Sequence, residues 1–165
     1  MGKGKVFLVG AGPGAPDLIT VRGLECIQQA DVLVYDRLVS NTLIRQAPRH
    51  AELIFAGKCA SHHLLEQDNI NELLLKHARK GKMVVRLKGG DPFIFGRGGE
   101  ESLFLAEHGI PVEVIPGLSS TLAVPAAVGI PLTHRDYASS IAILTGHRRR
   151  DGKVTVTRAD TLVYL

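Results

Sequence analysis

The sequence predicts an α/β fold built on a parallel β-sheet, and three observations indicate this fold class. Short runs of β-branched residues alternate with longer amphipathic segments, which is typical of βαβ units. The runs are mostly apolar along their length, as expected of parallel strands covered by helices on both faces. Glycines such as Gly81 and Gly109 close the amphipathic segments, where helices commonly end.

Five strands and four connecting helices are expected before residue 116, which makes a complete small α/β domain. Asp17 is expected to cap the first helix through its side-chain oxygen. The third helix carries Ile70 and Leu74 on one face, which should pack on the sheet. The expected strands are Val6–Val9, Val32–Tyr35, Glu52–Phe55, Met83–Leu87 and Val112–Ile115, and the expected helices are Asp17–Ala30, Ser40–Ala47, Gln67–Lys80 and Gly99–His108.

The pattern changes after Ile115. A helix of small residues is expected over Gly117–Val128, followed by strands at Ser140–Leu144 and Thr161–Leu165. Parallel strands need a crossover element between them, and the last strand ends the sequence without further cover. We therefore expect an N-terminal domain over residues 1–138 and the beginning of a second α/β domain over residues 139–165, truncated before it is complete.

Composition excludes several classes of protein. Of 165 residues, 45% are hydrophobic and 22% charged, which is ordinary for a globular chain and unlike a disordered one. The net charge of +4 comes largely from residues 146–165, where Arg148–Arg150 stand together. A DNA-binding domain would carry a broader basic stripe, and the absence of tryptophan leaves little for stacking on bases, so no nucleic-acid partner is expected.

The cysteines and the apolar runs exclude two further classes of site. Cys26 and Cys59 lack the spacing of a metal site, so no metal is expected, and reduced thiols in a cytoplasmic protein are the default interpretation. The longest apolar run, from Leu122 to Leu132, has 11 residues and contains two prolines. It is too short to span a membrane.

The first glycine-rich loop, Gly10–Ala15, follows a strand and precedes a helix. It satisfies the G-x-G-x-x-G/A pattern of dinucleotide-binding folds, and Asp36 ends the second strand. However, Pro13 and Pro16 each remove a backbone N–H group that a pyrophosphate would need. An uncharged part of a ligand fits this loop better than a phosphate does, and a tight turn without a ligand remains an alternative.

The second glycine-rich loop follows the fourth strand and is denser. Five glycines lie between Gly89 and Gly99, together with the carboxylate of Asp91 and the guanidinium of Arg97. Loops beyond the carboxyl ends of parallel strands form the binding crevice of open α/β sheets. Both glycine-rich loops therefore share one edge, together with Asp36 and Lys58. The alternative is a surface loop held by salt bridges.

These segments together closely resemble the tetrapyrrole methylases, over essentially the whole chain. The precorrin and diphthine methyltransferases share this fold, and the loop His134–Ala138 favours relatives that act on uroporphyrinogen. The segments that carry the resemblance are Gly10–Gly14 with Asp17–Thr20, Val34–Leu38, Val84–Glu101, Ile115–Gly117 and Gly129–Ala138.

The resemblance implies S-adenosylmethionine as cofactor, S-adenosylhomocysteine as its product, and two α/β domains in a homodimer. It also implies transfer of methyl groups to two pyrrole carbons of uroporphyrinogen III, giving precorrin-2 for sirohaem and cobalamin synthesis. Asp36 and Lys58 match the family's proton acceptor and donor, and Arg97 is a further candidate for proton transfer. The positions that match cofactor contacts are Pro13, Gly89, Gly90, Asp91, Ile94, Ser119 and Ser120.

The chemistry of the substrate indicates which side chains should meet it. Uroporphyrinogen carries eight carboxylates, for which Arg97, His134 and Arg135 are suitable partners, and Arg148–Arg150 a further possible group. Glu100 is expected to contact the substrate beside Arg97. Two alternatives stay open at this point, a non-catalytic fragment and a dinucleotide-dependent oxidoreductase.

Overall fold

The computed structural model describes residues 4–57, 67–145 and 158–165, and these form two compact units. The first unit is Met1–Leu118 and the second is Ser119–Leu165. The boundary between the two units lies directly before the helix of small residues at Ser120–Ala127. The sequence pattern predicted a domain boundary later in the chain, at Ala138.

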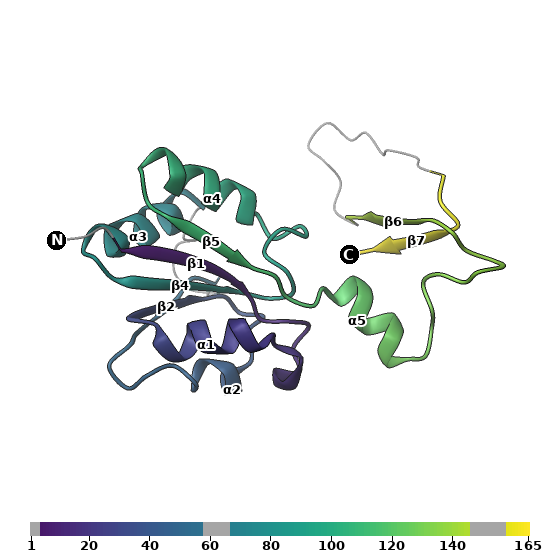
Figure 1. The fold of residues 1–165 in the computed structure, drawn as a ribbon, viewed down its shortest axis with the longest axis horizontal. Helices are drawn as coiled ribbons and strands as arrows, with labels where there is room; N and C mark the ends of the chain where they lie inside the picture. The colour runs from purple at the N-terminus through teal and green to yellow at the C-terminus, as the bar shows by residue number, and fades with distance from the viewer. Residues whose placement is uncertain (1–3, 58–66, 146–157) are drawn as a thin grey trace. The chain divides into compact units, whose positions relative to one another are not determined.

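The first unit is built on a five-stranded parallel sheet, which confirms the expected fold class (Figure 1). All four neighbouring strand pairs are parallel. The strand order is β3-β2-β4-β1-β5. The strands are β1 (Lys5–Gly10), β2 (Val32–Tyr35), β3 (Glu52–Phe55), β4 (Met83–Lys88) and β5 (Val112–Ile115).

Helices cover both faces of this sheet. In Figure 1, α1 and α2 lie below the strands, and α3 and α4 lie above them. Phe7 and Val9 of β1 pack in one core with Ile27 of α1, whereas Leu8 packs in a second core with Leu74 of α3. This alternation explains why the strands are apolar at consecutive positions. The helices are α1 (Val21–Gln29), α2 (Asn41–Ile44), α3 (Gln67–Arg79) and α4 (Gly98–Glu107).

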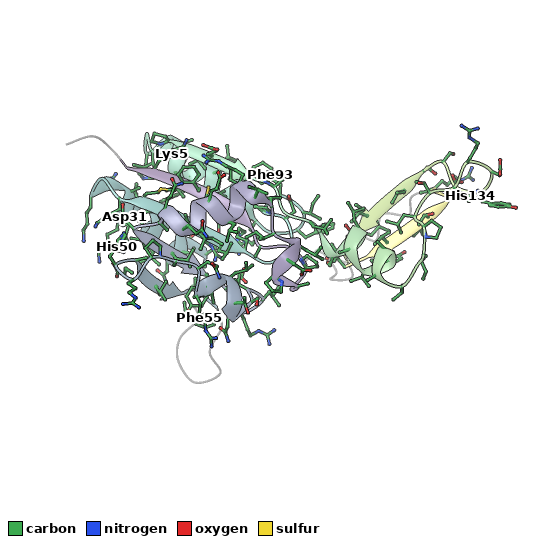
Figure 2. All side chains as sticks on the ribbon, turned by 60° about the horizontal axis from the view of Figure 1, so that its bottom comes forward. Lys5, Asp31, His50, Phe55, Phe93 and His134 are labelled. Atoms are coloured by element: carbon green, nitrogen blue, oxygen red, sulfur yellow. The ribbon has the colours of Figure 1, made fainter. Side chains whose placement is uncertain are left out.

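The order of the strands creates a switch point between β1 and β4. From β1 the chain crosses beyond β4 to reach β2, and from β4 it crosses beyond β1 to reach β5. The loops that follow these two neighbouring strands therefore leave in opposite directions, and this position at the carboxyl edge is where open α/β sheets commonly bind ligands. Figure 2 shows Lys5, Asp31 and His50 toward the amino ends of the strands and Phe93 toward the opposite end.

The start of the first helix differs from the expectation. Pro16–Leu18 form a short 3-10 helix, and α1 begins only at Val21. Thr20 caps it, because its hydroxyl accepts a hydrogen bond from the amide of Gly23 at 3.1 Å. The prediction that Asp17 caps this helix is therefore wrong. The proline favours a separate turn, and the threonine after it supplies the capping oxygen.

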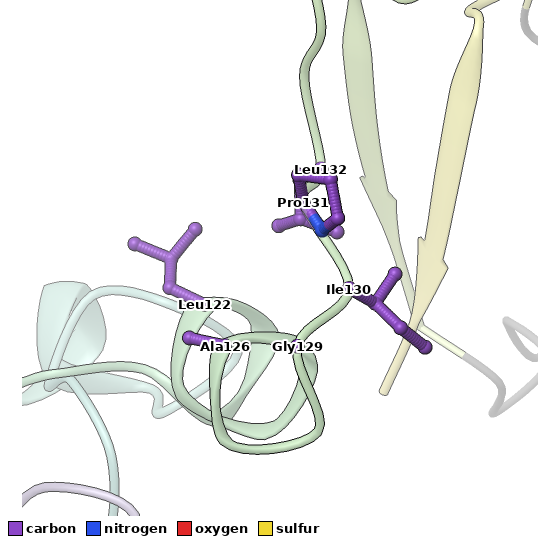
Figure 3. A pocket seen from close by; sticks show the side chains of 6 residues that line it. All are labelled: Leu122, Ala126, Gly129, Ile130, Pro131 and Leu132. Carbon is purple, nitrogen blue, oxygen red and sulfur yellow. The ribbon is translucent and has the colours of Figure 1, made fainter.

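The second unit contains one helix and a pair of strands in the part that the structure describes. They are α5 (Ser120–Ala127), β6 (Ile141–Leu144) and β7 (Thr161–Tyr164), and the two strands are parallel. The Asp160 carboxylate accepts hydrogen bonds from the amides and hydroxyls of Ser139 and Ser140, which joins the two strand starts. Figure 3 shows an apolar hollow beside α5, lined by Leu122, Ala126, Gly129, Ile130, Pro131 and Leu132.

Candidate active site at the carboxyl edge of the sheet

The two glycine-rich loops bind each other directly. The amide of Gly12 donates to the carbonyl of Gly90 at 3.2 Å, and the amide of Gly90 donates back to Gly12 at 2.7 Å. The amide of Ala11 also donates to the carbonyl of Lys88 at 2.7 Å. Gly12 and Gly90 both have a positive φ, of 79° and 65°, which favours glycine. The loops after β1 and β4 therefore form one backbone surface at the switch point.

Three backbone segments meet beside this pair. A Cβ added to Gly10 would lie 2.5 Å from the Cα of Gly117 and 2.6 Å from the carbonyl oxygen of Gly90. A Cβ added to Gly117 would overlap the same carbonyl oxygen and the Cα of Gly10. No larger residue fits at Gly10 or Gly117 unless the backbone shifts. The ends of β1 and β5 and the loop after β4 are thus held in close contact.

Asp91 fixes the loop after β4 to the end of β5. Its Oδ2 accepts a hydrogen bond from the amide of Gly117 at 3.0 Å, and its Oδ1 accepts one from the amide of Phe93 at 2.8 Å. The resemblance described above matches Asp91 to a cofactor contact. The residue is half-buried, and each of its carboxylate oxygens accepts a hydrogen bond from one of the protein's own amides, which fixes the shape of the loop.

The rest of this loop is strained and presents apolar side chains to solvent. Phe95 and Arg97 adopt positive φ angles of 51° and 58°, which cost energy for residues with a Cβ. Phe93, Ile94 and Phe95 are exposed. Backbone strain of this kind occurs most often at functional sites.

Arg97 is paired with Glu100 in the first turn of α4. The Arg97 Nη2 atom lies 2.6 Å from Glu100 Oε2, and both side chains are more than half exposed. The hydrogen bond to Arg97 lowers the pKa of the Glu100 carboxyl, and the same bond raises the pKa of Arg97. Arg97 therefore remains a cation at neutral pH with its face open to solvent, and an incoming carboxylate would compete with Glu100 for it.

Asp36 lies at the same edge, directly after β2. Its Oδ1 accepts a hydrogen bond from the amide of Leu38 at 3.0 Å, and its Oδ2 accepts one from the amide of Gly89 at 3.4 Å. The guanidinium of Arg86 approaches Oδ2 at 3.9 Å, while 24% of the Asp36 side chain remains exposed. The structure thus brings Asp36 beside the loop that contains Gly89, Gly90 and Asp91. Both carboxylate oxygens of Asp36 accept hydrogen bonds from amides, and part of the side chain remains accessible.

A cluster of buried charges lies beneath these loops, and the sequence analysis did not identify it as part of the site. Arg86 and Lys88 of β4 and Glu101 of α4 are all at most 4% exposed. Arg86 Nε lies 3.4 Å and Lys88 Nζ 3.0 Å from Glu101 Oε1. Burial, followed by the nearby charge of Arg86, lowers the pKa of Lys88. The sequence could have indicated this cluster, because Arg86 and Lys88 lie in a strand covered on both faces and buried cations require a counter-ion.

The remaining predicted site residues lie in different places. Pro13 is half-buried in the first loop. Ser119 caps α5, where its hydroxyl accepts hydrogen bonds from the amide and the hydroxyl of Thr121, and the half-buried Ser120 begins that helix. His134 and Arg135 are exposed on a loop of the second unit, where the ring of His134 lies 4.7 Å from that of Tyr137 (Figure 2). Lys58, Cys59 and Arg148–Arg150 lie outside the described residues.

The loop after β1 suits an uncharged part of a ligand better than a phosphate. Pro13 and Pro16 lack amides, and the amides of Ala11 and Gly12 are already bonded to the loop after β4. The loop after β1 therefore keeps the amides of Gly14 and Ala15 for a ligand, too few to surround a pyrophosphate.

Within the described ranges, no three His, Cys, Asp or Glu side chains gather as a metal site, and no helix is long and apolar enough to cross a membrane.

Comparison with known proteins agrees with this geometry. A sequence profile of the tetrapyrrole (corrin/porphyrin) methylases matches residues 5–165. The chain belongs to the tetrapyrrole methylase family. Within this family, it is 54% identical over 167 residues to the uroporphyrinogen-III C-methyltransferase of Methanocaldococcus jannaschii, and the match covers 98% of this chain. It is 52% identical over 166 residues to the enzyme of the same name from Bacillus subtilis, with 97% of this chain covered.

A solved structure in the family also matches. It is the uroporphyrin-III C-methyltransferase of Thermus thermophilus in complex with S-adenosylhomocysteine, with a TM-score of 0.79 and 45% identity over 98% of this chain. The chain spans 69% and 65% of the lengths of the two relatives from Methanocaldococcus and Bacillus, and 65% of that solved chain.

Proposed function

We propose that this chain carries out S-adenosylmethionine-dependent methylation of carbon atoms on uroporphyrinogen III, giving precorrin-2 for sirohaem and cobalamin synthesis. The observation that carries the proposal is the paired backbone of Gly12 and Gly90 at the switch point between β1 and β4. Family membership supports the class of reaction, and the names of the relatives support the substrate.

The cofactor would lie against the paired loops, held mainly by backbone. Pro13, Gly89, Gly90, Asp91 and Ile94 would form its site in the first unit. Ser119 and Ser120, our further candidates for cofactor contacts, belong to the second unit. A glycine-lined surface with few amides fits the thioether and the uncharged adenosine of S-adenosylhomocysteine better than the pyrophosphate of a dinucleotide. A solved relative that binds S-adenosylhomocysteine supports this assignment.

When bound, the cofactor supplies an electrophilic methyl group on a sulfonium. The protein's task is then to orient the pyrrole carbon in line with that methyl group and to exclude water. The carbon that accepts the methyl group later loses a proton, which requires a base within hydrogen-bond reach. Asp36 is our candidate for this base, because its carboxylate is fixed by two amides and still partly exposed. Lys58 is our candidate for the proton donor.

The substrate's carboxylates would be held by cations at the same edge. Arg97 keeps its charge and is exposed, and its partner Glu100 is a further candidate for contact with the substrate. His134 and Arg135, which belong to the second unit, are further candidates for binding carboxylates. We further propose that the protein acts as a cytoplasmic homodimer without a nucleic-acid or membrane partner, which light scattering and cell fractionation can test.

Calorimetric titration with S-adenosylhomocysteine and with NAD⁺ tests the proposed cofactor. We expect binding of S-adenosylhomocysteine in the micromolar range and no heat with NAD⁺. Tight binding of NAD⁺ with none of S-adenosylhomocysteine would instead support an oxidoreductase. Failure to bind either ligand would support a non-catalytic fragment.

A further inference from the structure

The buried charges beneath the active-site edge are unusual in being concentrated on one carboxylate oxygen. Glu101 Oε1 accepts hydrogen bonds from Arg86 Nε at 3.4 Å, from Lys88 Nζ at 3.0 Å and from Gln67 Nε2 at 3.1 Å. Glu101 Oε2 is buried without a hydrogen-bond partner among the described residues. Glu101 is therefore the point at which β4, α3 and the first turn of α4 are joined by polar contacts.

This arrangement carries a large desolvation cost. Glu101 is 0% exposed, and Arg86 and Lys88 are each 4% exposed. The free energy needed to remove such charges from water often exceeds the gain from their mutual attraction. Apolar side chains of similar volume commonly make a protein as stable or more stable. A cluster that stability alone does not require can serve to fix the geometry of a neighbouring group.

The neighbouring group is Asp36. Arg86 lies between the two carboxylates: its Nε atom donates to Glu101, and its Nη2 atom approaches Asp36 Oδ2 at 3.9 Å. The guanidinium is a planar, rigid group, so fixing its Nε side also sets the direction of its Nη side. Asp36 Oδ2 is also the atom that accepts a hydrogen bond from the amide of Gly89, in the loop after β4.

We propose that Glu101 is a positioning residue, which holds Arg86 against Asp36 and so fixes the carboxylate that we assign as proton acceptor. The inference rests on the proposed function, because it gives Asp36 a part in the reaction. Glu101 does not touch the substrate and acts only through Arg86. Lys88 and Gln67 keep the shared oxygen of Glu101 in place from β4 and α3.

The experiment is a double-mutant cycle with Glu101→Gln, Arg86→Met and the variant that carries both substitutions. If Glu101 acts through Arg86, each single substitution lowers kcat for methyl transfer by about 10- to 100-fold, as expected for a misplaced catalytic group. The double variant then loses no more than Arg86→Met alone, since the effects of residues in one linkage do not add. The dissociation constant of S-adenosylhomocysteine stays within about twofold throughout, because Asp36 is not a proposed cofactor contact.

Several results overturn the inference. One is a folded Glu101→Gln variant with wild-type kcat. Another is a double variant whose fold-decrease in kcat is the product of the two single decreases. A third is a loss of affinity for S-adenosylhomocysteine that parallels the decrease in kcat. If Glu101→Gln does not fold, Arg86→Met and the double variant, which removes one charge of each sign, decide the question. Equal kcat values well below wild type support the linkage, whereas a wild-type kcat in Arg86→Met, or a further loss in the double variant, refutes it.

Glu113→Gln is a matched control. Glu113 is another carboxylate with two cationic partners, Lys5 and Arg22, but it lies on β5 and outside the proposed site. We expect it to keep wild-type kcat.

A readout independent of activity separates this inference from the proposed function. The ¹⁵Nε–¹H NMR signal of Arg86 should exchange slowly with solvent in the wild-type protein and in Glu113→Gln, and rapidly in Glu101→Gln. If the wild-type protein transfers no methyl group, the proposed function fails, and the Arg86 signal still tests the positioning. Unchanged slow exchange in Glu101→Gln would show that Glu101 does not hold Arg86.

Discussion

Replacement of Asp91 by alanine tests how the backbone of the site is held. The substitution removes the acceptor of two amides, those of Gly117 at 3.0 Å and Phe93 at 2.8 Å. The amide of Phe93 lies at an exposed position, where water can replace the carboxylate. The amide of Gly117 is partly buried where three backbone segments meet, so its bond is harder to replace.

The expected magnitude follows from these two bonds. A hydrogen bond to a charged group contributes about 1.5 to 3 kcal/mol, and an amide left without a partner in a buried place costs about 1 to 3 kcal/mol. Because one of the two bonds is exposed, we expect Asp91→Ala to lower the free energy of unfolding by about 2 kcal/mol. Displacement of Gly117 from Gly90 disturbs the cofactor surface, and we expect affinity for S-adenosylhomocysteine to fall by about tenfold or more.

Urea denaturation and calorimetric titration measure the two effects. Asp91→Asn is the matched variant, because its single carbonyl oxygen can accept one of the two hydrogen bonds but not both. We expect it to fall between wild type and Asp91→Ala in stability and in affinity. If Asp91→Ala keeps wild-type affinity for S-adenosylhomocysteine, the assignment of this loop as the cofactor site is refuted. If it keeps wild-type stability, the bond to Gly117 does not hold the loop.

Three further predictions concern other parts of the first unit. Gly117→Ala should lower the affinity for S-adenosylhomocysteine by about tenfold or more, because the new Cβ overlaps the Gly90 carbonyl. Gly99→Ala is the control, because its Cβ meets open space and should leave the affinity unchanged. Equal affinities of the two variants would contradict the close approach of Gly117 to Gly90. Arg97→Ala should lower the rate of methyl transfer by about 100-fold. It should lower the free energy of unfolding by less than about 1 kcal/mol, because the ion pair with Glu100 is exposed. A large loss of stability together with the loss of activity would indicate a structural ion pair. Burial lowers the pKa of His77, so between that value and the unfolded value near 6.5 the unfolded chain binds more protons and stability falls as pH falls. Urea denaturation at several pH values should show this slope in wild type and a smaller one in His77→Gln, and the same slope in both would exclude His77 as its source.

The sheet could be predicted from the sequence because its signal is local. Buried parallel strands are apolar at consecutive positions, and each expected strand of the first unit overlaps an observed one with at most one residue of difference at either end. Helix starts were less predictable, because several oxygens compete for the capping position. Asp17 and Thr20 both precede α1, and only the path of the chain after Pro16 decides that Thr20 caps it.

The composition of the site was predictable only in part. Glycines at Gly10, Gly90 and Gly117 stand out in the sequence, but their mutual contact depends on the order of the strands, which places β4 and β5 on either side of β1. The buried pairing of Arg86 with Glu101 depends on how α4 returns over the sheet. The sequence shows only that a charged residue lies in an otherwise apolar strand, and it does not show which residue pairs with that charge.

Incubation with methyl-labelled S-adenosylmethionine and uroporphyrinogen III under anaerobic conditions tests the central claim most directly. Mass spectrometry of the tetrapyrrole should show a product that has gained two labelled methyl groups, with S-adenosylhomocysteine formed in matching amount. A tetrapyrrole that stays unlabelled with a folded protein that binds S-adenosylhomocysteine would contradict the proposed methylation of uroporphyrinogen III.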